Sequence, residues 1–274
     1  MFKNKILLSL ATSLLIGLVS GSCTQTTSTE AVRSNERSSP PQRPGGYLLD
    51  RVPAAVDFLP PPPVSDSIEE QAELQIFRDT RALAGSPRWE MATKDVAFNM
   101  WSTFSCALGA EVNPENVPLT SRFIRRVSSD VYPIMGQQKD FYNRPRPYTL
   151  AEGDTCSQMD EQSANTSYPS GHSTGGWTWA LLLAELVPDR AGQIIGRGRA
   201  FGESRVVCGV HYPSDVVAGQ TIATTVITTM QSDPEFIADR DAAKTELAAV
   251  LAGAPEPDQA RCSLEKELIQ QRPW

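Results

Sequence analysis

The sequence predicts an all-α protein that forms a single-domain helical bundle. Apolar residues recur at three- and four-residue steps along most of the chain after Ser67, and this is the period of a helix. No stretch of useful length alternates apolar and polar residues as a half-buried strand would. The 274 residues, 40% of them hydrophobic and 21% charged, suffice for one well-buried domain. We therefore expect roughly six to eight helices around one core.

The individual helices are predicted from their start signals and apolar positions. Ser67 followed by Glu69 and Glu70 predicts a capped helix start with acidic residues in the first turn. Residues 177–187 are apolar nearly all round and predict a central helix. Three other helices are indicated by Ala97, Met100, Trp101, Phe104 and Leu108, by Phe123, Ile124, Val127, Val131 and Ile134, and by Val216, Val217, Ala223, Val226, Ile227 and Met230.

The segment 1–22 has the parts of an export signal. Lys3 and Lys5 precede an apolar run over positions 6–19, and small residues follow it. A bilayer crossing needs about 20 apolar residues, so this run is too short to span comfortably. The best later window, 177–187, is shorter still and contains Glu185. We expect an exported, periplasmic protein and not a multi-span membrane protein.

Composition divides the chain into four segments. Residues 1–22 are the predicted signal peptide, and residues 23–56, rich in Ser, Thr, Pro and charge, are predicted to be a disordered tether. A stiff run of four prolines lies near the start of the helical domain, predicted over 57–252. Residues 253–274 are a C-terminal extension.

The net charge of −7 limits the choice of partners. Removal of the signal segment, which carries two Lys and no acid, makes the chain more negative still. We therefore expect no nucleic-acid partner, because nucleic-acid binding usually needs a basic surface. An anionic ligand must instead be held by a local cluster of cations. The oligomeric state stays open, and a homo-oligomer is compatible with the sequence.

The odd number of cysteines in an exported chain needs an explanation. Cys23 stands where the signal ends, so it is a candidate for the lipid-modified first residue of a lipoprotein, which would anchor the protein to a membrane. The alternative is ordinary cleavage nearby, with Cys23 left free or removed. Lipidation would leave Cys106, Cys156, Cys208 and Cys262 for two disulfides in an oxidising compartment.

Three stretches break the plain helical pattern and hold the residues suited to chemistry. They are 139–147, 168–173 and 203–215, and they contain both histidines of the chain, His172 and His211.

The second stretch opens the buried helix. Ser170, Gly171 and His172 therefore lie where free backbone N–H groups and the positive dipole end favour an anion. Gly171 would let an oxyanion approach the backbone closely.

Three cations accompany these stretches: Lys139, Arg146 and Arg205. A point charge and two guanidinium forks match phosphate oxygens well. Each cation alone is best explained as a surface charge, and each histidine alone as a structural residue. Their co-occurrence, with no histidine elsewhere, indicates a phosphate site.

These residues resemble the signature of the type 2 phosphatidic acid phosphatase and vanadium haloperoxidase superfamily. That signature has three parts. In the first, six residues separate a Lys from an Arg-Pro pair, and the second is Pro-Ser-Gly-His. In the third, Ser-Arg is followed after five residues by His and after three more by Asp. The chain supplies every position: Lys139, Arg146-Pro147, Pro169-Ser170-Gly171-His172, Ser204-Arg205, His211 and Asp215. Residues 59–63, 202–209 and 232–236 also resemble the bacterial class A non-specific acid phosphatases. The resemblance covers about residues 57–250.

The resemblance implies an acid phosphatase of broad specificity that acts on small phosphate monoesters and releases inorganic phosphate. It implies that His211 is the nucleophile, that Asp215 orients it, and that His172 is the general acid and base. The phosphate-binding residues would be Lys139, Arg146, Ser170, Gly171 and Arg205. No metal and no cofactor is expected. Because His172 must be protonated while His211 is neutral, we expect an activity optimum below neutral pH.

The same resemblance supports a Cys156–Cys208 disulfide, and a Cys106–Cys262 pair would follow by elimination. Cys156 lies between the first and second motif stretches, and Cys208 lies just before His211 in the third. The bridge would clamp the loop after Arg-Pro to the nucleophile segment.

Three other functions compete with the phosphatase interpretation. A vanadium-dependent haloperoxidase would use the same anion cradle, but the short chain and the class A features disfavour it. An integral lipid phosphatase is disfavoured by the lack of apolar spans. A non-catalytic phosphate-binding protein would not need both histidines and Asp215. The preferred phosphate ester and the ratio of hydrolysis to phosphotransfer are not predictable from the sequence.

Overall fold

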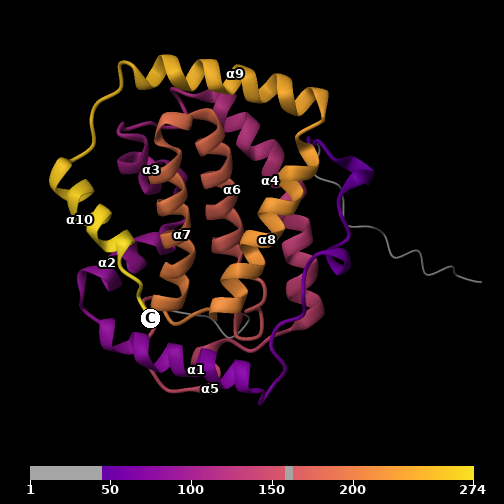
Figure 1. The fold of residues 1–274 in the computed structure, drawn as a ribbon, viewed down its shortest axis with the longest axis vertical. Helices are drawn as coiled ribbons and strands as arrows, with labels where there is room; N and C mark the ends of the chain where they lie inside the picture. Colours follow the sequence, from indigo (N-terminus) through magenta and orange to yellow (C-terminus); the bar gives the residue numbers. More distant parts are fainter. Residues whose placement is uncertain (1–44, 158–162) are drawn as a thin grey trace, which may run out of the picture. The chain divides into compact units, whose positions relative to one another are not determined.

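The structure, a computed structural model, describes residues 45–157 and 163–274, and these belong to one compact unit (Figure 1). The described residues form ten α-helices and several 3-10 turns, and none of them is in a strand. The predicted all-α fold is confirmed. The number of helices exceeds the expected six to eight because short helices such as α5 carry too little periodicity to be recognised.

The α-helices are α1 (Ile68–Thr80), α2 (Pro87–Lys94), α3 (Met100–Leu108), α4 (Pro118–Tyr142), α5 (Pro147–Leu150), α6 (Gly171–Leu186), α7 (Ala191–Val207), α8 (Pro213–Met230), α9 (Pro234–Leu251) and α10 (Gln259–Gln270).

The helix predicted to be central is α6, which packs against α4, α7 and α8. Glycines bring these helices close together. A side chain at Gly198 of α7 would meet Ala180 of α6, and one at Gly219 of α8 would meet the backbone of Ser170. The close approach buries the α6 side chains almost completely, so the first residue of α6 is held firmly relative to α7 and α8.

The start of α1 is as predicted, whereas the start of α3 is not. The Ser67 hydroxyl accepts a hydrogen bond from the backbone N–H of Glu70 and so caps α1. The pattern that predicted a helix from Ala97 is broken at Phe98, whose backbone is left-handed with φ of 46°. Ala97 belongs instead to the short 3-10 helix η4 (Asp95–Ala97), and α3 begins after its cap, Asn99.

The domain begins earlier than residue 57. Tyr47 and Leu48, assigned above to the tether, are buried in the core. Their backbone N–H groups both donate to the Asp130 carboxylate on α4, which satisfies two donors that would otherwise be buried without partners. The signal peptide, Cys23 and the predicted tether up to residue 44 lie outside the described residues.

The C-terminal extension is folded against the domain. A disulfide joins Cys262 on α10 to Cys106 on α3, with the two Cα atoms 5.2 Å apart. The Arg199 guanidinium on α7 donates to the Ile269 carbonyl. Within the described ranges, no helix combines the length and the apolar character that a membrane crossing requires.

One end of the bundle gathers the three motif stretches. α6 and α8 begin there, while α4 and α7 end there. In Figure 1 this is the lower end, and α1 runs beneath it, whereas α9 crosses the opposite end. Segments far apart in sequence therefore meet around the starts of α6 and α8.

Candidate active site

The His211 imidazole is fixed by a buried carboxylate one helical turn away. His211 lies just before the start of α8 and is 4% exposed, and Asp215 in the first turn of α8 is fully buried. The imidazole Nδ1 lies 3.2 Å from Asp215 Oδ2. A carboxylate accepts a hydrogen bond from a protonated Nδ1, so the lone pair of a neutral His211 is left on Nε2.

The Nε2 nitrogen of His211 faces Arg146. The guanidinium Nη1 of Arg146 lies 3.1 Å from His211 Nε2 and also donates to the Val210 carbonyl at 2.7 Å. Burial lowers the pKa of His211 well below its ordinary value, and the charges of Arg146, Lys139 and Arg205 lower it further. His211 is therefore neutral when no anion is bound, and its Nε2 lone pair then faces the Arg146 N–H group.

Two other cations complete the cluster around Nε2. Arg205 is 4% exposed, and its Nε and Nη1 have no hydrogen-bond partner among the described residues. Burial lowers the pKa of Arg205 to about 10, with Arg146 contributing. The Lys139 ammonium donates to the Thr166 carbonyl, and burial, helped by Arg146, lowers its pKa to about 7. Buried cations with unsatisfied donors call for an anion.

The start of α6 adds backbone donors to these cations. Ser170 is the N-cap of α6 and is fully buried, with its hydroxyl accepting from the Ser173 N–H at 3.3 Å. A methyl group at Gly171 would lie 3.6 Å from Met135 Cε and 3.9 Å from Lys139 Cε, so Gly171 lies beside the Lys139 side chain. The start of α6 and the Lys139 side chain thus lie close together, and the charges of Lys139, Arg146 and Arg205 all act on His211.

His172, the second histidine, lies on the first turn of α6. Its Nε2 lies 3.3 Å from the Val96 carbonyl of η4, and its ring contacts Phe98 and stacks on Phe201. Burial lowers the pKa of His172 to about 3, with Arg205 as the next contributor. Without a bound anion His172 is neutral above this pH, and a bound anion would raise the pKa of His172.

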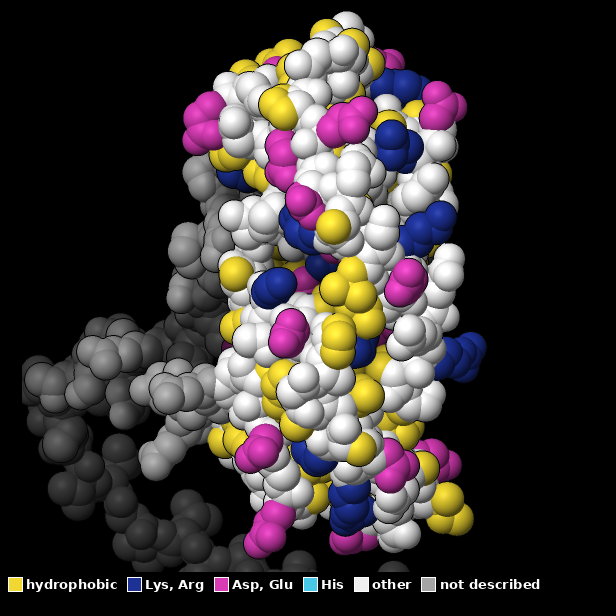
Figure 2. All heavy atoms as spheres, turned by 90° about the vertical axis from the view of Figure 1, so that its left-hand side faces the viewer, with side chains coloured by type: hydrophobic (Ala, Val, Ile, Leu, Met, Phe, Trp, Pro, Cys, Tyr) yellow, Lys and Arg dark blue, Asp and Glu magenta, His cyan; other side chains and the backbone are white. Residues whose placement is uncertain are grey.

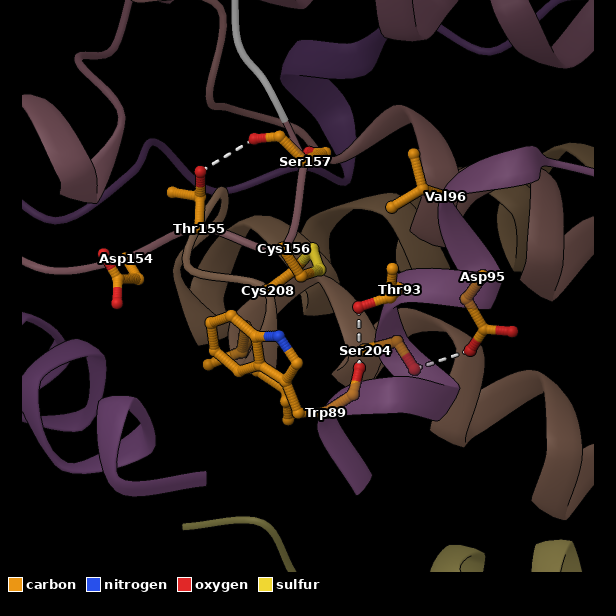
Figure 3. The surroundings of a disulfide bond; sticks show 12 residues. Trp89, Thr93, Asp95, Val96, Asp154, Thr155, Cys156, Ser157, Ser204 and Cys208 are labelled. Atoms are coloured by element: carbon orange, nitrogen blue, oxygen red, sulfur yellow. Dashed lines mark hydrogen bonds between the residues drawn. A yellow bond between two sulfur atoms is a disulfide. The ribbon is translucent and has the colours of Figure 1, made fainter. Parts of the chain in front are cut away.

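The predicted Cys156–Cys208 disulfide is present at the end of α7 (Figure 3). The Cys156 N–H also donates to the Cys208 carbonyl at 3.2 Å. Arg81 reinforces this junction, since its guanidinium donates to the Val207 carbonyl at 2.7 Å and to the Asp154 carbonyl. The loop that follows Arg146 is thereby tied to the segment that leads into His211.

The sequence interpretation missed two charged residues of this site, Arg144 and Glu73. Arg144 Nη1 donates to Asp215 Oδ1 at 2.7 Å, and Arg144 Nη2 donates to Glu73 on α1 at 2.9 Å. Arg144 was available as a signal, because it stands between two motif residues in the first stretch. Glu73 was not, because nothing in its helical surroundings distinguishes it from a solvated acid.

A cavity in the described part of the chain is lined by neither histidine. It measures about 310 Å³ and lies between α2, α3, α7 and α10, with Asp95, Arg197 and Glu265 among its lining residues. Figure 2 shows this side of the molecule, where charged side chains of both signs lie around a hollow. Arg197 pairs with both carboxylates, so these charges compensate one another.

Comparison with known proteins agrees with the site. Residues 127–236 match the PAP2 superfamily, and this range contains all three motif stretches. The chain is 38% identical over 214 residues to an acid phosphatase of Zymomonas mobilis. The aligned region covers 76% of this chain and 81% of the Zymomonas protein. This chain belongs to the bacterial acid phosphatases of the PAP2 superfamily.

Other acid phosphatases give the same result. The non-specific acid phosphatase of Salmonella typhimurium is 36% identical over 185 residues, or 65% of this chain and 74% of that one. The non-specific acid phosphatase of Providencia stuartii is 34% identical over 214 residues, or 75% and 86% of the two chains. The family resemblance seen in the motifs is therefore confirmed over most of the chain.

Proposed function

We propose that this member of the acid phosphatase family has broad specificity and hydrolyses phosphate monoesters through a phosphohistidine on His211. The observation that carries the proposal is the placement of His211 Nε2. Its partner nitrogen is held by Asp215 at 3.2 Å, while Nε2 itself faces Arg146 in a cluster of cations. A nucleophile with a fixed tautomer beside three cations fits attack on a phosphoryl group.

In the first half-reaction the Nε2 lone pair attacks phosphorus and the ester P–O bond breaks. His172, protonated once substrate is bound, gives its proton to the leaving alkoxide. Arg146, Arg205, Lys139 and the N–H groups at the start of α6 hold the non-bridging oxygens as charge redistributes. Asp215 stabilises the positive charge that develops on the His211 ring.

In the second half-reaction His172, now neutral, accepts a proton from water. The resulting hydroxide attacks phosphorus, the P–N bond breaks, and inorganic phosphate leaves with His211 again neutral. One full cycle returns both histidines to their starting protonation states, so the scheme balances without a further reactant.

Trapping of the phosphoenzyme by a rapid alkaline quench in detergent tests the nucleophile. Protein mixed with a substrate labelled in its phosphoryl group should carry an acid-labile, base-stable label, and His211→Ala should carry none. His172→Ala is the matched variant, since it removes the other histidine and should still be labelled by p-nitrophenyl phosphate. A label retained by His211→Ala would contradict the assignment.

We also propose that the reaction needs no metal. Across residues 45–157 and 163–274, no three His, Cys, Asp or Glu side chains are grouped as metal ligands would be. A panel of phosphate esters assayed with and without EDTA tests this and reports the specificity. Vanadate-loaded protein assayed for halide oxidation serves as the control for the haloperoxidase alternative.

Export to the periplasm is proposed on the signal-like residues 1–22 together with the two disulfides of the domain. Mass spectrometry of the mature N-terminus decides between a lipid-modified Cys23 and ordinary cleavage. An unmodified peptide containing Cys23 would contradict the lipid anchor. Sedimentation of the purified protein would settle whether it forms a homo-oligomer.

A further inference from the structure

A chain of buried charges extends from His211 to a helix far away in sequence. Asp215 Oδ2 lies against His211, and Asp215 Oδ1 accepts from Arg144 at 2.7 Å. The other terminal nitrogen of Arg144 donates to Glu73 Oε2 at 2.9 Å. These side chains alternate in sign, and those of Arg144 and Asp215 are 4% and 0% exposed.

Arg144 is held through both terminal nitrogens and through the face of its guanidinium. Its guanidinium carbon lies 3.9 Å from the centroid of the Tyr212 ring, and Nη1 also donates to the Ser214 hydroxyl at 2.8 Å. Burial lowers its pKa, but the carboxylates of Asp215 and Glu73 outweigh burial, and the pKa of Arg144 is raised. A guanidinium fixed at both ends leaves Asp215 little freedom to rotate.

Glu73 ties this arrangement to the start of α8. Its Oε1 accepts from the Ser214 N–H at 2.6 Å, and its Oε2 accepts from the Ser214 hydroxyl at 2.9 Å. A carboxylate is favoured at that place because the first N–H groups of α8 have no helical partners. Asp215 is the next residue of α8, so Glu73 determines where the Asp215 backbone lies as well as where Arg144 points.

The remaining contacts of Asp215 show what Arg144 adds. Oδ2 accepts from the Ser167 hydroxyl at 2.6 Å and from the Tyr212 N–H at 2.9 Å, besides its contact with His211. Oδ1 has its contact with Arg144. Without Arg144, rotation of the carboxylate would be opposed only by the contacts of Oδ2 with Ser167 and Tyr212, and the Nδ1 contact would be less firmly directed.

We propose that Glu73 and Arg144 are positioning residues that act through Asp215 to set the tautomer and orientation of the His211 imidazole. This inference rests on the proposed role of His211 as nucleophile. Neither residue touches the phosphoryl position, so their effect should fall on kcat and leave substrate binding nearly unchanged.

The presence of only two histidines makes a direct test practical. Imidazole ¹⁵N NMR of the full-length protein, with His172→Asn to assign the signals, reports the tautomer of His211 without any reaction. The wild-type protein should show His211 protonated on Nδ1. Glu73→Gln, which keeps an oxygen for the Ser214 N–H, and Arg144→Lys should both give a mixture of tautomers.

Kinetics provide the second readout. We expect kcat for p-nitrophenyl phosphate to fall about 10- to 100-fold in both variants, with KM within about twofold, because a small misplacement of a reacting atom has effects of this size. Asp239→Asn is the matched control. It breaks another 2.7 Å Arg–Asp pair, with Arg126 between α9 and α4, and should change neither kcat nor the tautomer.

Each remaining outcome overturns the inference. Unchanged kcat and an unchanged ¹⁵N spectrum in Glu73→Gln would show that the charge chain positions nothing. A lower kcat with the wild-type tautomer, or a change in KM alone, would place the effect elsewhere. If Arg144→Lys does not fold, Glu73→Gln decides. A separate experiment tests whether His211 is the nucleophile: a phosphoryl label retained by His211→Ala would refute that role independently of the effects of Glu73 and Arg144.

Discussion

The rings of Phe98 and His172 meet edge to face, with their centroids 4.8 Å apart. Phe98 holds this place with a left-handed backbone, φ 46°, a conformation that costs a bulky residue of the order of 1 kcal/mol or more. The neighbouring Val96 carbonyl lies 3.3 Å from His172 Nε2. The turn before α3 therefore fixes the ring that we assign to proton transfer.

Replacing Phe98 by Ala should loosen His172 and slow reactions that need its proton. We expect kcat for an alkyl phosphate to fall about 10-fold more than kcat for p-nitrophenyl phosphate, whose leaving group needs little protonation. Steady-state assays of both substrates on one preparation give the ratio. An equal loss for both would show that Phe98 supports the fold alone.

Arg205 should lower the stability of the empty protein. Its Nε and Nη1 are buried without hydrogen-bond partners, and its charge lies beside Arg146. Arg205→Met should therefore raise the midpoint of thermal unfolding while it abolishes measurable hydrolysis. Calorimetry with and without inorganic phosphate tests this, since phosphate should stabilise the wild-type protein much more than the variant. A less stable empty variant would contradict the explanation.

The stability of the empty protein should decrease in acid. The pKa of His172 in the folded protein is about 3, below its ordinary value of 6.5, and the pKa of His211 is lowered in the same direction. Between these pH values the unfolded chain binds protons that the folded chain does not. Stability is thus complete above pH 6.5 and falls as the pH drops toward 3, by up to about 1.4 kcal/mol per pH unit for each histidine.

Urea unfolding at pH 7, 5 and 4 measures this slope. Inorganic phosphate should reduce it, because the bound anion favours the protonated form of His172. His172→Asn should remove the contribution of one histidine. A slope that is the same in His172→Asn and the wild-type protein would contradict the assignment to His172.

The two disulfides should differ in their effect on catalysis. Each double Cys→Ser variant should lose about 2–4 kcal/mol of stability. Only Cys156→Ser/Cys208→Ser should also lose kcat, because that bridge lies at the end of α7 near His211. Cys106→Ser/Cys262→Ser, whose bridge joins α3 to α10, is the control. Equal kcat in the two variants, measured well below their unfolding temperatures, would show that the first bridge does not hold the site.

Much of the fold was predictable because helical periodicity is local. The segment 177–187 was recognised as central from its own residues, and it forms the C-terminal part of α6 and its cap. The start of α3 was not predictable, since the left-handed turn at Phe98 depends on contacts with α6 and α7. Tyr47 and Leu48 were misassigned because the partner of their backbone, Asp130, lies far along the chain.

The residues of the candidate site also divide into those that the sequence predicted and those that only the structure shows. The residues proposed to touch phosphate stand in short stretches whose types and spacing are visible in the sequence. The structure adds the buried neighbours that determine what those residues can do, such as Glu73. The residues around a single acid on an amphipathic helix do not indicate which residue it will pair with. The role of Glu73 is therefore visible only once α1 is packed against the start of α8.

In the proposed arrangement, the position of Glu73 makes the orientation of His211 depend on α1, a helix at the edge of the unit. Helices of this kind often open locally without global unfolding. If α1 opens from the start of α8, the charge chain to His211 is cut while α6, α7 and α8 stay packed. The fraction of active molecules would then follow the opening equilibrium of α1. Hydrogen exchange at α1 would report the same quantity as the loss of activity on mild warming.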